Sequence, residues 1–300
     1  MILVSGASSF LGSEIIRQLL NRGEVIKGLY GPEEDVSHLF PNTANLTLYP
    51  CSLLDICTLC EVMEGVDAVF HGDLIFEYQP ATFQHRMKYN VEGTANLVNA
   101  MLDNQVSKLI FFSSLSSLAS QPGKPGNSSS LIEQNEWTTE QAQSILSAER
   151  EVWRGSEEGL QVSVVNAASI VVHSQKGFHL ISQSLAELET GVVEIYPSKI
   201  YTIELTELVE TALKIYYSDK YWGKRFLAIG QEQSNSEFYH ELAEQNFIAY
   251  REKRMNKRSV FFKVLKDFLL SLLTGKIRTF RRTNGKRLLS QIEYQKSQFE

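Results

Sequence analysis

The segment that decides the fold is MILVSGASSFLG, residues 1–12. Its apolar residues 2–4 predict a short β-strand, and the small residues SGASS that follow predict a turn. The apolar spacing that begins at Phe10 and Leu11 predicts a helix. A strand, a glycine-containing turn and a helix start of this kind bind a pyrophosphate, because free N–H groups and the helix dipole point at it.

The glycines of this turn match a dinucleotide-binding fingerprint in part. The fingerprint has three glycines, which allow a tight turn, close approach of the phosphates and close packing of helix on strand. Gly6 and Gly12 occupy the first and last positions, whereas Ser9 occupies the middle one. A Cβ and a hydroxyl there crowd the pyrophosphate, although the hydroxyl can donate a hydrogen bond to it. The candidate phosphate-binding residues are Gly6, Ser8, Ser9, Phe10, Leu11 and Gly12.

The composition is that of a globular protein. The chain has 300 residues, of which 43% are hydrophobic and 21% are charged, enough for one large domain. No cleavable signal fits the N-terminus, and no apolar run reaches the roughly 18–20 residues that span a bilayer. Three cysteines are too few for a disulfide framework, and Cys57 and Cys60 lack the further ligands of a zinc site. These features predict a cytoplasmic protein without a metal centre.

The charges are unevenly distributed. Residues 251–287 contain 13 Lys or Arg and two acids, which leaves 16 of the 29 basic and 33 of the 35 acidic residues elsewhere. We interpret this basic segment as a solvated face, with a membrane surface as the alternative and no nucleic acid expected as a partner. Within it, residues 260–273 predict an apolar helix whose polar residues share one narrow face. We expect this helix to cap a pocket, pack on a neighbour or lie in a membrane plane.

Apolar β runs alternate with helical patterns along the first half of the chain. The predicted strands are residues 2–4, 25–30, 46–49, 68–71, 108–113 and 161–165, and the predicted helices are 53–64, 81–104 and 138–158. This alternation predicts an α/β fold with a Rossmann-like, doubly wound parallel sheet. We place this core at residues 1–168 and a small α+β substrate-type subdomain at 169–300, with residues 203–230 returning to the core.

Several segments resemble the extended short-chain dehydrogenase/reductase family, in the branch of the NAD-dependent epimerase/dehydratases. They are VSGASSFLG at 4–12, VDAVFH at 66–71, YNVEGTANL at 89–97, KLIFFSS at 108–114 and AEREV at 148–152. Their order and spacing fit the family over about residues 1–230. The resemblance implies the parallel fold, a dinucleotide cofactor and a homodimer built from the helices at 81–104 and 138–158.

The resemblance also implies a catalytic centre, of which one residue is present. In this family a serine at the end of the fifth strand binds the reacting group, and that position is Ser114. A tyrosine and a lysine on the next helix transfer the proton, because the lysine lowers the phenol pKa from about 10 toward neutrality. The matching positions hold Gln141 and Ile145, and residues 135–148 contain no Tyr or Lys. The proton relay of the family is therefore absent.

The residues expected around a cofactor are altered as well. Residues 29–32 provide neither the acid that selects NAD nor the arginine that selects NADP. Asp73 puts a carboxylate near the phosphates, where repulsion costs about 1 kcal/mol at 4 Å in water. We expect NAD or NADP binding to be weakened or lost. The resemblance adds these residues to the candidate cofactor site: Asp55, His71, Gly72, Asn90, Ser113 and Asn166.

Three functions are compatible with these observations. The first is a catalytically inactive or divergent family member that binds a dinucleotide or another anion at residues 6–12. The second is an active epimerase, dehydratase or carbonyl reductase with a replacement acid, for which the candidates are His71, Asp73, Glu133 and Glu136. The third is an interaction module that uses the basic segment 251–287. The sequence does not predict which small molecule is bound.

Overall fold

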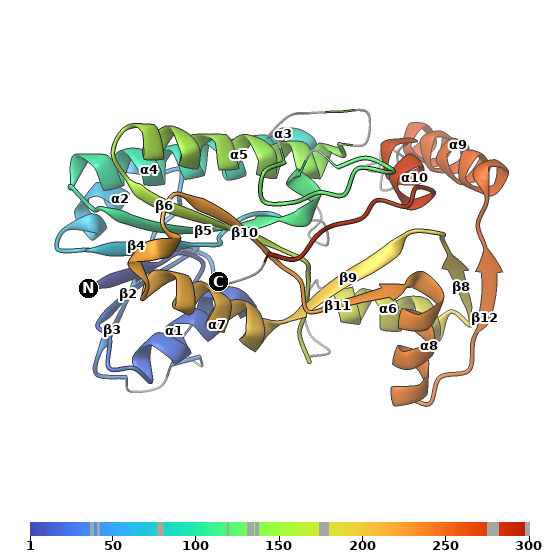
Figure 1. Ribbon diagram of the computed structural model, residues 1–300, viewed down its shortest axis with the longest axis horizontal. Helices are drawn as coiled ribbons and strands as arrows, with labels where there is room; N and C mark the ends of the chain where they lie inside the picture. Colours follow the sequence, from blue (N-terminus) through green and yellow to red (C-terminus); the bar gives the residue numbers. More distant parts are fainter. Residues whose placement is uncertain are drawn as a thin grey trace.

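The computed structural model describes residues 1–36, 39–40, 43–76, 81–118, 120–130, 135, 138–173, 180–274 and 282–297. Within this part of the chain, a seven-stranded sheet carries helices on both faces, and a smaller mixed subdomain lies at one end (Figure 1).

All neighbouring strands of the main sheet run parallel, in the order β10-β6-β5-β4-β1-β2-β3. The strands are β1 (Ile2–Val4), β2 (Ile26–Tyr30), β3 (Leu46–Pro50), β4 (Ala68–His71), β5 (Lys108–Ser114), β6 (Gln161–Ala167) and β10 (Lys224–Ala228). The strand order reverses between β1 and β4, so their carboxyl ends mark the edge where such sheets bind ligands. The predicted α/β fold with a doubly wound parallel sheet is confirmed.

Successive side chains of a strand point to opposite faces of the sheet, and helices cover both faces of this one. Both faces are therefore apolar. Ile2 and Val4 belong to the core on one face, which includes α1 (Phe10–Leu20) and α7 (Leu205–Tyr216). Leu3 belongs to the core on the other face, which includes α2 (Ile56–Met63), α4 (Gly93–Asp103) and α5 (Glu140–Glu157). Figure 1 shows these two layers above and below the strands.

The helix predicted over residues 81–104 has three parts. They are α3 (Phe83–Arg86), a π-helical segment η1 (Met87–Glu92) and α4. Asn90 lies in the π-helical segment and is completely buried. Its side chain accepts a hydrogen bond from the N–H of Ile75 at 2.8 Å and donates to the carbonyl oxygen of Ile75 at 3.2 Å. Asn90 therefore fixes the segment that follows β4.

The subdomain contains two small sheets. In one, β9 (Lys199–Glu204) lies between β7 (Ser169–Val171) and β11 (Gln231–Ser234); in the other, β8 (Val192–Ile195) pairs with β12 (Arg251–Arg254). The sequence did not predict β7, β8, β11 or β12. The helices are α6 (Leu180–Glu189), α8 (Asn235–Gln245), α9 (Lys257–Thr274) and α10 (Arg282–Leu288). None of the described helices combines the length and apolar character needed to cross a bilayer.

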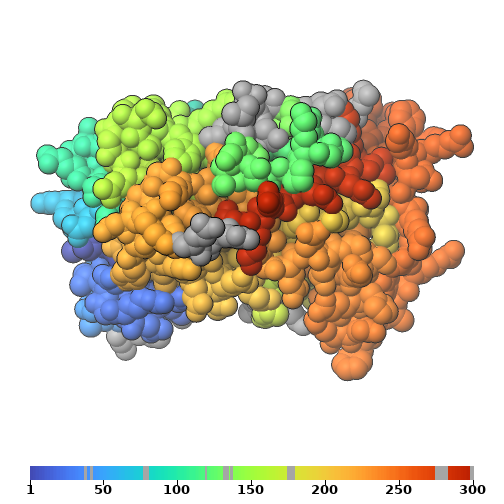
Figure 2. Space-filling model, viewed as in Figure 1, coloured from blue at the N-terminus to red at the C-terminus, as the bar shows by residue number. Residues whose placement is uncertain are grey.

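The end of the chain returns from α10 to the main sheet. Tyr294 forms a β-bridge with Gly126, and Leu227 of β10 exchanges hydrogen bonds with Ser297. Figure 2 shows this segment, in red, lying against the loop that follows β5. The last residues described therefore join the subdomain to the core.

Candidate functional site

The turn after β1 brings backbone atoms very close together. Gly6 has φ = +68°, in the left-handed region that favours glycine. A Cβ on Gly12 would lie 2.1 Å from the carbonyl oxygen of Gly6, so only glycine lets α1 pack on the turn. The first turn of α1 presents N–H groups that lack intrahelical acceptors, at the positive end of the helix. The backbone of residues 6–12 is therefore suited to an anion.

Ser9, at the position of the middle glycine, caps α1. Its Oγ accepts a hydrogen bond from the N–H of Gly12 at 3.0 Å and donates one to the carbonyl oxygen of Gly6 at 2.7 Å. The hydroxyl proton is therefore donated within the turn. A serine cap typically stabilises a helix by about 1 kcal/mol.

Two carboxylates border the turn. Glu34 Oε2 accepts hydrogen bonds from Ser8 Oγ at 2.6 Å and from the N–H of Gly31 at 2.8 Å. The second carboxylate, Asp73, lies on the other side of the turn. A Cβ added to Gly6 would lie 3.1 Å from the Cβ of Asp73. Residues 29–32 supply no acid themselves, but Glu33, Glu34 and Asp35 follow directly. The turn in which the N–H of Glu34 donates to the carbonyl oxygen of Gly31 brings Glu34 back to Ser8.

Asp73 is half-buried and hydrogen-bonded. The phenol of Tyr89 donates to Asp73 Oδ2 at 2.8 Å, and the N–H of Asp73 donates to Ser5 Oγ at 3.3 Å. Burial is the main cause that raises the pKa of Asp73 from 3.8 to about 6. The hydrogen bond from Tyr89 lowers this pKa by a smaller amount, and the charge of Glu34 raises it slightly. Burial, followed by the charge of Asp73, raises the pKa of Tyr89 far above its usual value. At neutral pH Asp73 therefore places a negative charge beside the turn.

His71, the last residue of β4, has no exposed surface. Its Nδ1 lies 2.8 Å from Ser5 Oγ, and its Nε2 lies 3.0 Å from Thr94 Oγ1. Burial lowers the pKa of His71 to about 3, so the ring is neutral at physiological pH. The neutral, enclosed ring is held between Ser5 and Thr94, an environment that does not favour the role of a replacement acid.

Three other predicted cofactor residues lie beneath the surface. Asn90, Ser113 and Asn166 are at most 1% exposed. Ser113 Oγ donates to Glu149 Oε2 at 2.7 Å, and Asn166 Nδ2 donates to the carbonyl oxygen of Ser114 at 3.2 Å. Their side chains therefore connect strands and helices under the site, and their contact with a cofactor stays a prediction.

Glu149 and Arg225 form a buried ion pair that the sequence did not reveal. Arg225, on β10, donates to Glu149 Oε1 through Nε at 2.9 Å and through Nη2 at 2.5 Å. The side chains of Arg225 and Glu149 are 6% and 1% exposed. Glu149 Oε2 also accepts hydrogen bonds from Ser113, Ser117 and Asn166. Glu149 lies in the family-like segment at 148–152, but nothing near Arg225 indicates a partner 76 residues away.

Ser114 lies at the carboxyl end of β5 and is half-buried. Its Oγ lies 2.9 Å from Ser116 Oγ and accepts a hydrogen bond from the N–H of Ser116 at 3.1 Å. On α5, Gln141 is half-buried, whereas Ile145 is fully buried in the apolar core. The sequence of α5 contains no tyrosine and no lysine. The candidate acids Glu133 and Glu136 lie outside the described residues.

Asp55 and Gly72 have local structural roles. Asp55 caps α2 by accepting hydrogen bonds from the Thr58 hydroxyl at 2.7 Å and the Thr58 N–H at 3.2 Å, and these lower the pKa of Asp55. A Cβ on Gly72 would lie 2.8 Å from Leu11 Cδ2, so Gly72 lets Leu11 of α1 approach the end of β4.

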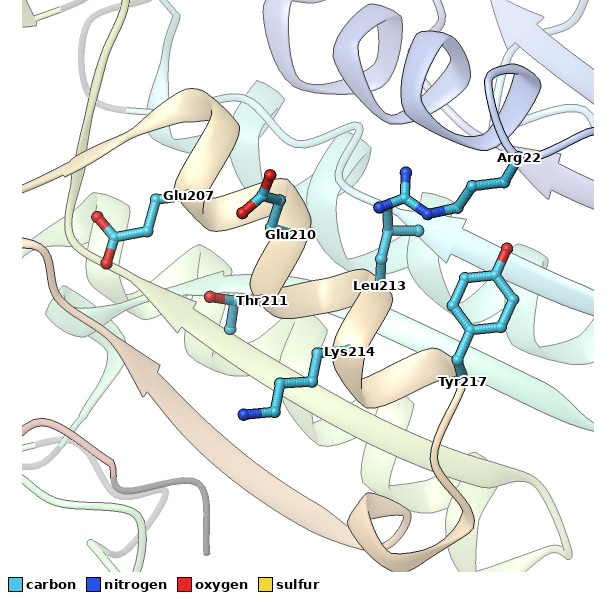
Figure 3. Close-up of a pocket in the computed structure, with 7 residues that line it drawn as sticks. All are labelled: Arg22, Glu207, Glu210, Thr211, Leu213, Lys214 and Tyr217. Carbon is cyan, nitrogen blue, oxygen red and sulfur yellow. The ribbon is translucent and has the colours of Figure 1, made fainter.

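A surface groove of about 460 Å³ is formed by a different part of the molecule, α7 and the chain just after α1. Figure 3 shows its lining side chains along α7, with Arg22 near Tyr217 at one end. The residues are Arg22, Glu207, Glu210, Thr211, Leu213, Lys214 and Tyr217. The turn of residues 6–12 lies at the opposite end of α1, so this groove is separate from the candidate site.

The parallel sheet, the turn of residues 6–12 and the position of Ser114 define an extended short-chain dehydrogenase/reductase. Residues 3–160 match the sequence model of the 3-beta hydroxysteroid dehydrogenase/isomerase family. The chain belongs to this family.

Known relatives and solved structures agree with this assignment. Sterol demethylase protein B of Methylococcus capsulatus is 25% identical over 231 residues, which are 76% of this chain and 69% of that protein. Cinnamoyl-CoA reductase 2 of Arabidopsis thaliana is 26% identical over 143 residues, 46% of this chain and 42% of the reductase, so less than half of the reductase is spanned.

Two solved structures share the fold over nearly the whole chain. The crystal structure of gox2253 has a TM-score of 0.82 at 21% identity. The match covers 99% of this chain and 90% of the gox2253 chain. The structure of MoeE5 in complex with UDP-glucuronic acid and NAD has a TM-score of 0.72 at 19% identity. The match covers 98% of this chain and 94% of the MoeE5 chain.

Proposed function

We propose that this protein is a catalytically divergent family member that binds NAD at residues 6–12 and lacks the proton relay of the family's oxidoreductases. The observation that carries the proposal is the sequence of α5, which contains neither tyrosine nor lysine. We take Gln141 and Ile145 as the positions that match the phenol and the ammonium group of the family. Glutamine does not titrate, and isoleucine carries no charge. Ser114 can orient a carbonyl oxygen by a hydrogen bond, but its neutral hydroxyl is a poor proton donor.

The turn fits the pyrophosphate of a dinucleotide. Of the two neighbouring acids, one favours a bound dinucleotide and the other opposes it. The left-handed Gly6 and the close contact of Gly12 leave a cradle of backbone. Glu34, held on Ser8, is suited to accept hydrogen bonds from ribose hydroxyls. Asp73 instead repels phosphate oxygens. When bound, a nicotinamide dinucleotide supplies a hydride donor or acceptor, and these residues only hold and orient it.

Titration with NADH, followed by the fluorescence of the cofactor, tests this proposal. We expect saturable binding but no turnover with sugar nucleotides, steroids or flavonoid-like carbonyl compounds. Turnover that Ser114→Ala abolishes would show an active enzyme instead. Failure of both NADH and NADPH to bind would remove the dinucleotide from the proposal.

Glu34 should make the site prefer NADH to NADPH. A 2′-phosphate brought near its carboxylate is repelled by about 1 kcal/mol in water, which is about a fivefold difference in dissociation constant. We therefore expect Glu34→Gln to reduce the NADH preference about fivefold in parallel titrations. Glu33→Gln is the matched control, since Glu33 is an exposed neighbour on the same turn. If Glu33→Gln reduced the NADH preference as much as Glu34→Gln, the preference would come from the net charge of the protein alone.

Asp73 supports a second candidate function, an active enzyme with a replacement acid. Its raised pKa, about 6, lies close to neutral pH, as general acid catalysis requires. If Asp73 is this acid, turnover should fall as the pH rises above 6. Asp73→Asn should then abolish turnover while NADH still binds.

A further inference from the structure

Helix α9 exposes its apolar side. Six of the exposed apolar residues of α9 are Phe261, Phe262, Leu265, Leu269, Leu272 and Leu273, with exposed fractions from 39% to 82%. Isolated exposed apolar residues are common, but a contiguous set of this size marks an interaction surface. We call these six residues the α9 apolar face. Figure 1 shows α9 at the end of the subdomain, far from the N-terminus.

The opposite, partly polar side of α9 packs on the protein. Val260 is buried with Tyr196 and Met255, and Val264 packs against the same cluster. Lys263 forms an ion pair with Glu194 and donates a hydrogen bond to Tyr196 Oη at 3.2 Å. Asp267 and Ser271 lie on this side too, half-buried. The helix therefore packs on a neighbour, as one of the expectations stated, but it does so through its partly polar side. The contacts of Lys263 with Glu194 and Tyr196 leave the apolar face directed outward.

The charge around the α9 apolar face is positive. Lys266 is exposed among the apolar residues, and Lys257 and Arg258 are exposed in the first turn of the helix. Cations are unfavourable at a helix N-terminus, because the helix dipole is positive there. Arg251 and Arg254 of β12 are exposed just before the helix. An anionic surface outside the protein would offset both the dipole and the mutual repulsion of these cations.

A second copy of this chain fits this surface poorly. Two α9 helices packed symmetrically would bring like charges together. Outside α9, the large exposed apolar residues of the described part of the chain are Met1, Phe10, Val25, Val192, Tyr217 and Phe247. They come from separate segments and offer no second apolar helix face. A lipid surface supplies both properties at once, since acyl chains accept Phe and Leu and anionic headgroups accept Lys and Arg.

We propose that α9 lies in the plane of an anionic membrane surface and holds the protein there as a peripheral protein. The six residues of the α9 apolar face enter the boundary of headgroups and acyl chains, while Lys257, Arg258 and Lys266 contact lipid phosphates. Glu194 and Tyr196 hold Lys263 on the protein side and so fix the rotation of the helix. The inference does not depend on the proposed dinucleotide site, because α9 belongs to the other part of the molecule.

Flotation of the full chain with lipid vesicles tests this inference. We expect binding to phosphatidylcholine vesicles that contain phosphatidylglycerol and much weaker binding to phosphatidylcholine alone. Lys257→Gln with Arg258→Gln should weaken binding about fivefold per cation. Phe262→Ser with Leu269→Ser should weaken it at least about tenfold, because both side chains lose their apolar environment. Raising the salt from low to physiological levels should also weaken binding by the wild-type protein.

Matched variants separate this surface from general effects of charge and hydrophobicity. Phe247→Ser removes a phenylalanine that is 97% exposed outside α9, and Lys124→Gln with Lys224→Gln removes two exposed cations elsewhere. We expect both to bind vesicles like the wild type. Equal binding to both kinds of vesicle, or none to either, would overturn the inference. A wild-type dimer that Phe262→Ser with Leu269→Ser converts to a monomer in sedimentation velocity would also overturn it.

Discussion

Replacing Arg225 by methionine should lower the free energy of unfolding by about 3 to 5 kcal/mol, the usual cost of leaving a buried charge without its partner. The change removes both hydrogen bonds from the guanidinium to Glu149 Oε1. Glu149 is then an enclosed carboxylate whose other partners are the neutral side chains of Ser113, Ser117, Trp153 and Asn166. Urea unfolding at pH 7, followed by circular dichroism, measures the loss.

Two variants control this experiment. Arg154→Met removes an arginine of α5 whose ion pairs with Glu151 and Glu158 are partly exposed, so we expect a loss of about 1 kcal/mol or less. Combining Arg225→Met with Glu149→Gln removes the stranded charge and should recover more than half of the loss. A single-variant loss as small as that of Arg154→Met would contradict the assignment of a buried ion pair.

Replacing Asp73 by asparagine should stabilise the protein at pH 8 and have little effect at pH 4. The pKa of Asp73 in the folded state, about 6, lies above the value of 3.8 for the unfolded chain. Protonated Asp73 therefore adds to the free energy of unfolding in full below about pH 4, and this contribution is lost as the pH rises through 6. Two pKa units correspond to about 3 kcal/mol, and the partial exposure of Asp73 reduces our expectation to about 2 kcal/mol. Asparagine keeps an acceptor for Tyr89 without the charge. Urea unfolding at several pH values measures the difference.

The same substitution should strengthen NADH binding at pH 8, because it removes a negative charge beside Gly6. Binding to the wild type should likewise strengthen as the pH falls through 6. Asp219→Asn is the control, since the Asp219 side chain is 99% exposed and its replacement should change stability by less than about 0.5 kcal/mol. An Asp73→Asn protein with the pH profile of the wild type would show that Asp73 does not titrate near 6.

The main sheet could be predicted because its strands are short apolar runs between turn residues. The ends of β1 to β6 lie within two residues of the predicted limits. The strands QEQS of β11 and REKR of β12 were missed, since their composition is polar and their pairing with β9 and β8 defines them as strands. The π-helical segment was missed too, because its sequence has the apolar spacing of an ordinary helix.

The backbone of the candidate site could be predicted, but most of its side-chain contacts could not. Gly6 and Gly12 follow from steric rules that act within a few residues. The approach of Glu34 to Ser8, by contrast, depends on a turn whose path the sequence leaves open, and the pairing of Glu149 with Arg225 depends on β10 joining β6. Burial of His71, Asn90 and Asn166 likewise results from packing between elements distant in sequence.

The returning C-terminal segment has a mechanical consequence. The chain passes between core and subdomain from β6 to β7, from β9 to α7, from β10 to β11, and finally from α10 to Tyr294. The subdomain therefore cannot swing on a single hinge, since several backbone connections would have to bend together. For the same reason, one proteolytic nick in any of these connections leaves the fragments held together, and the cleaved protein should still elute from a sizing column as one particle.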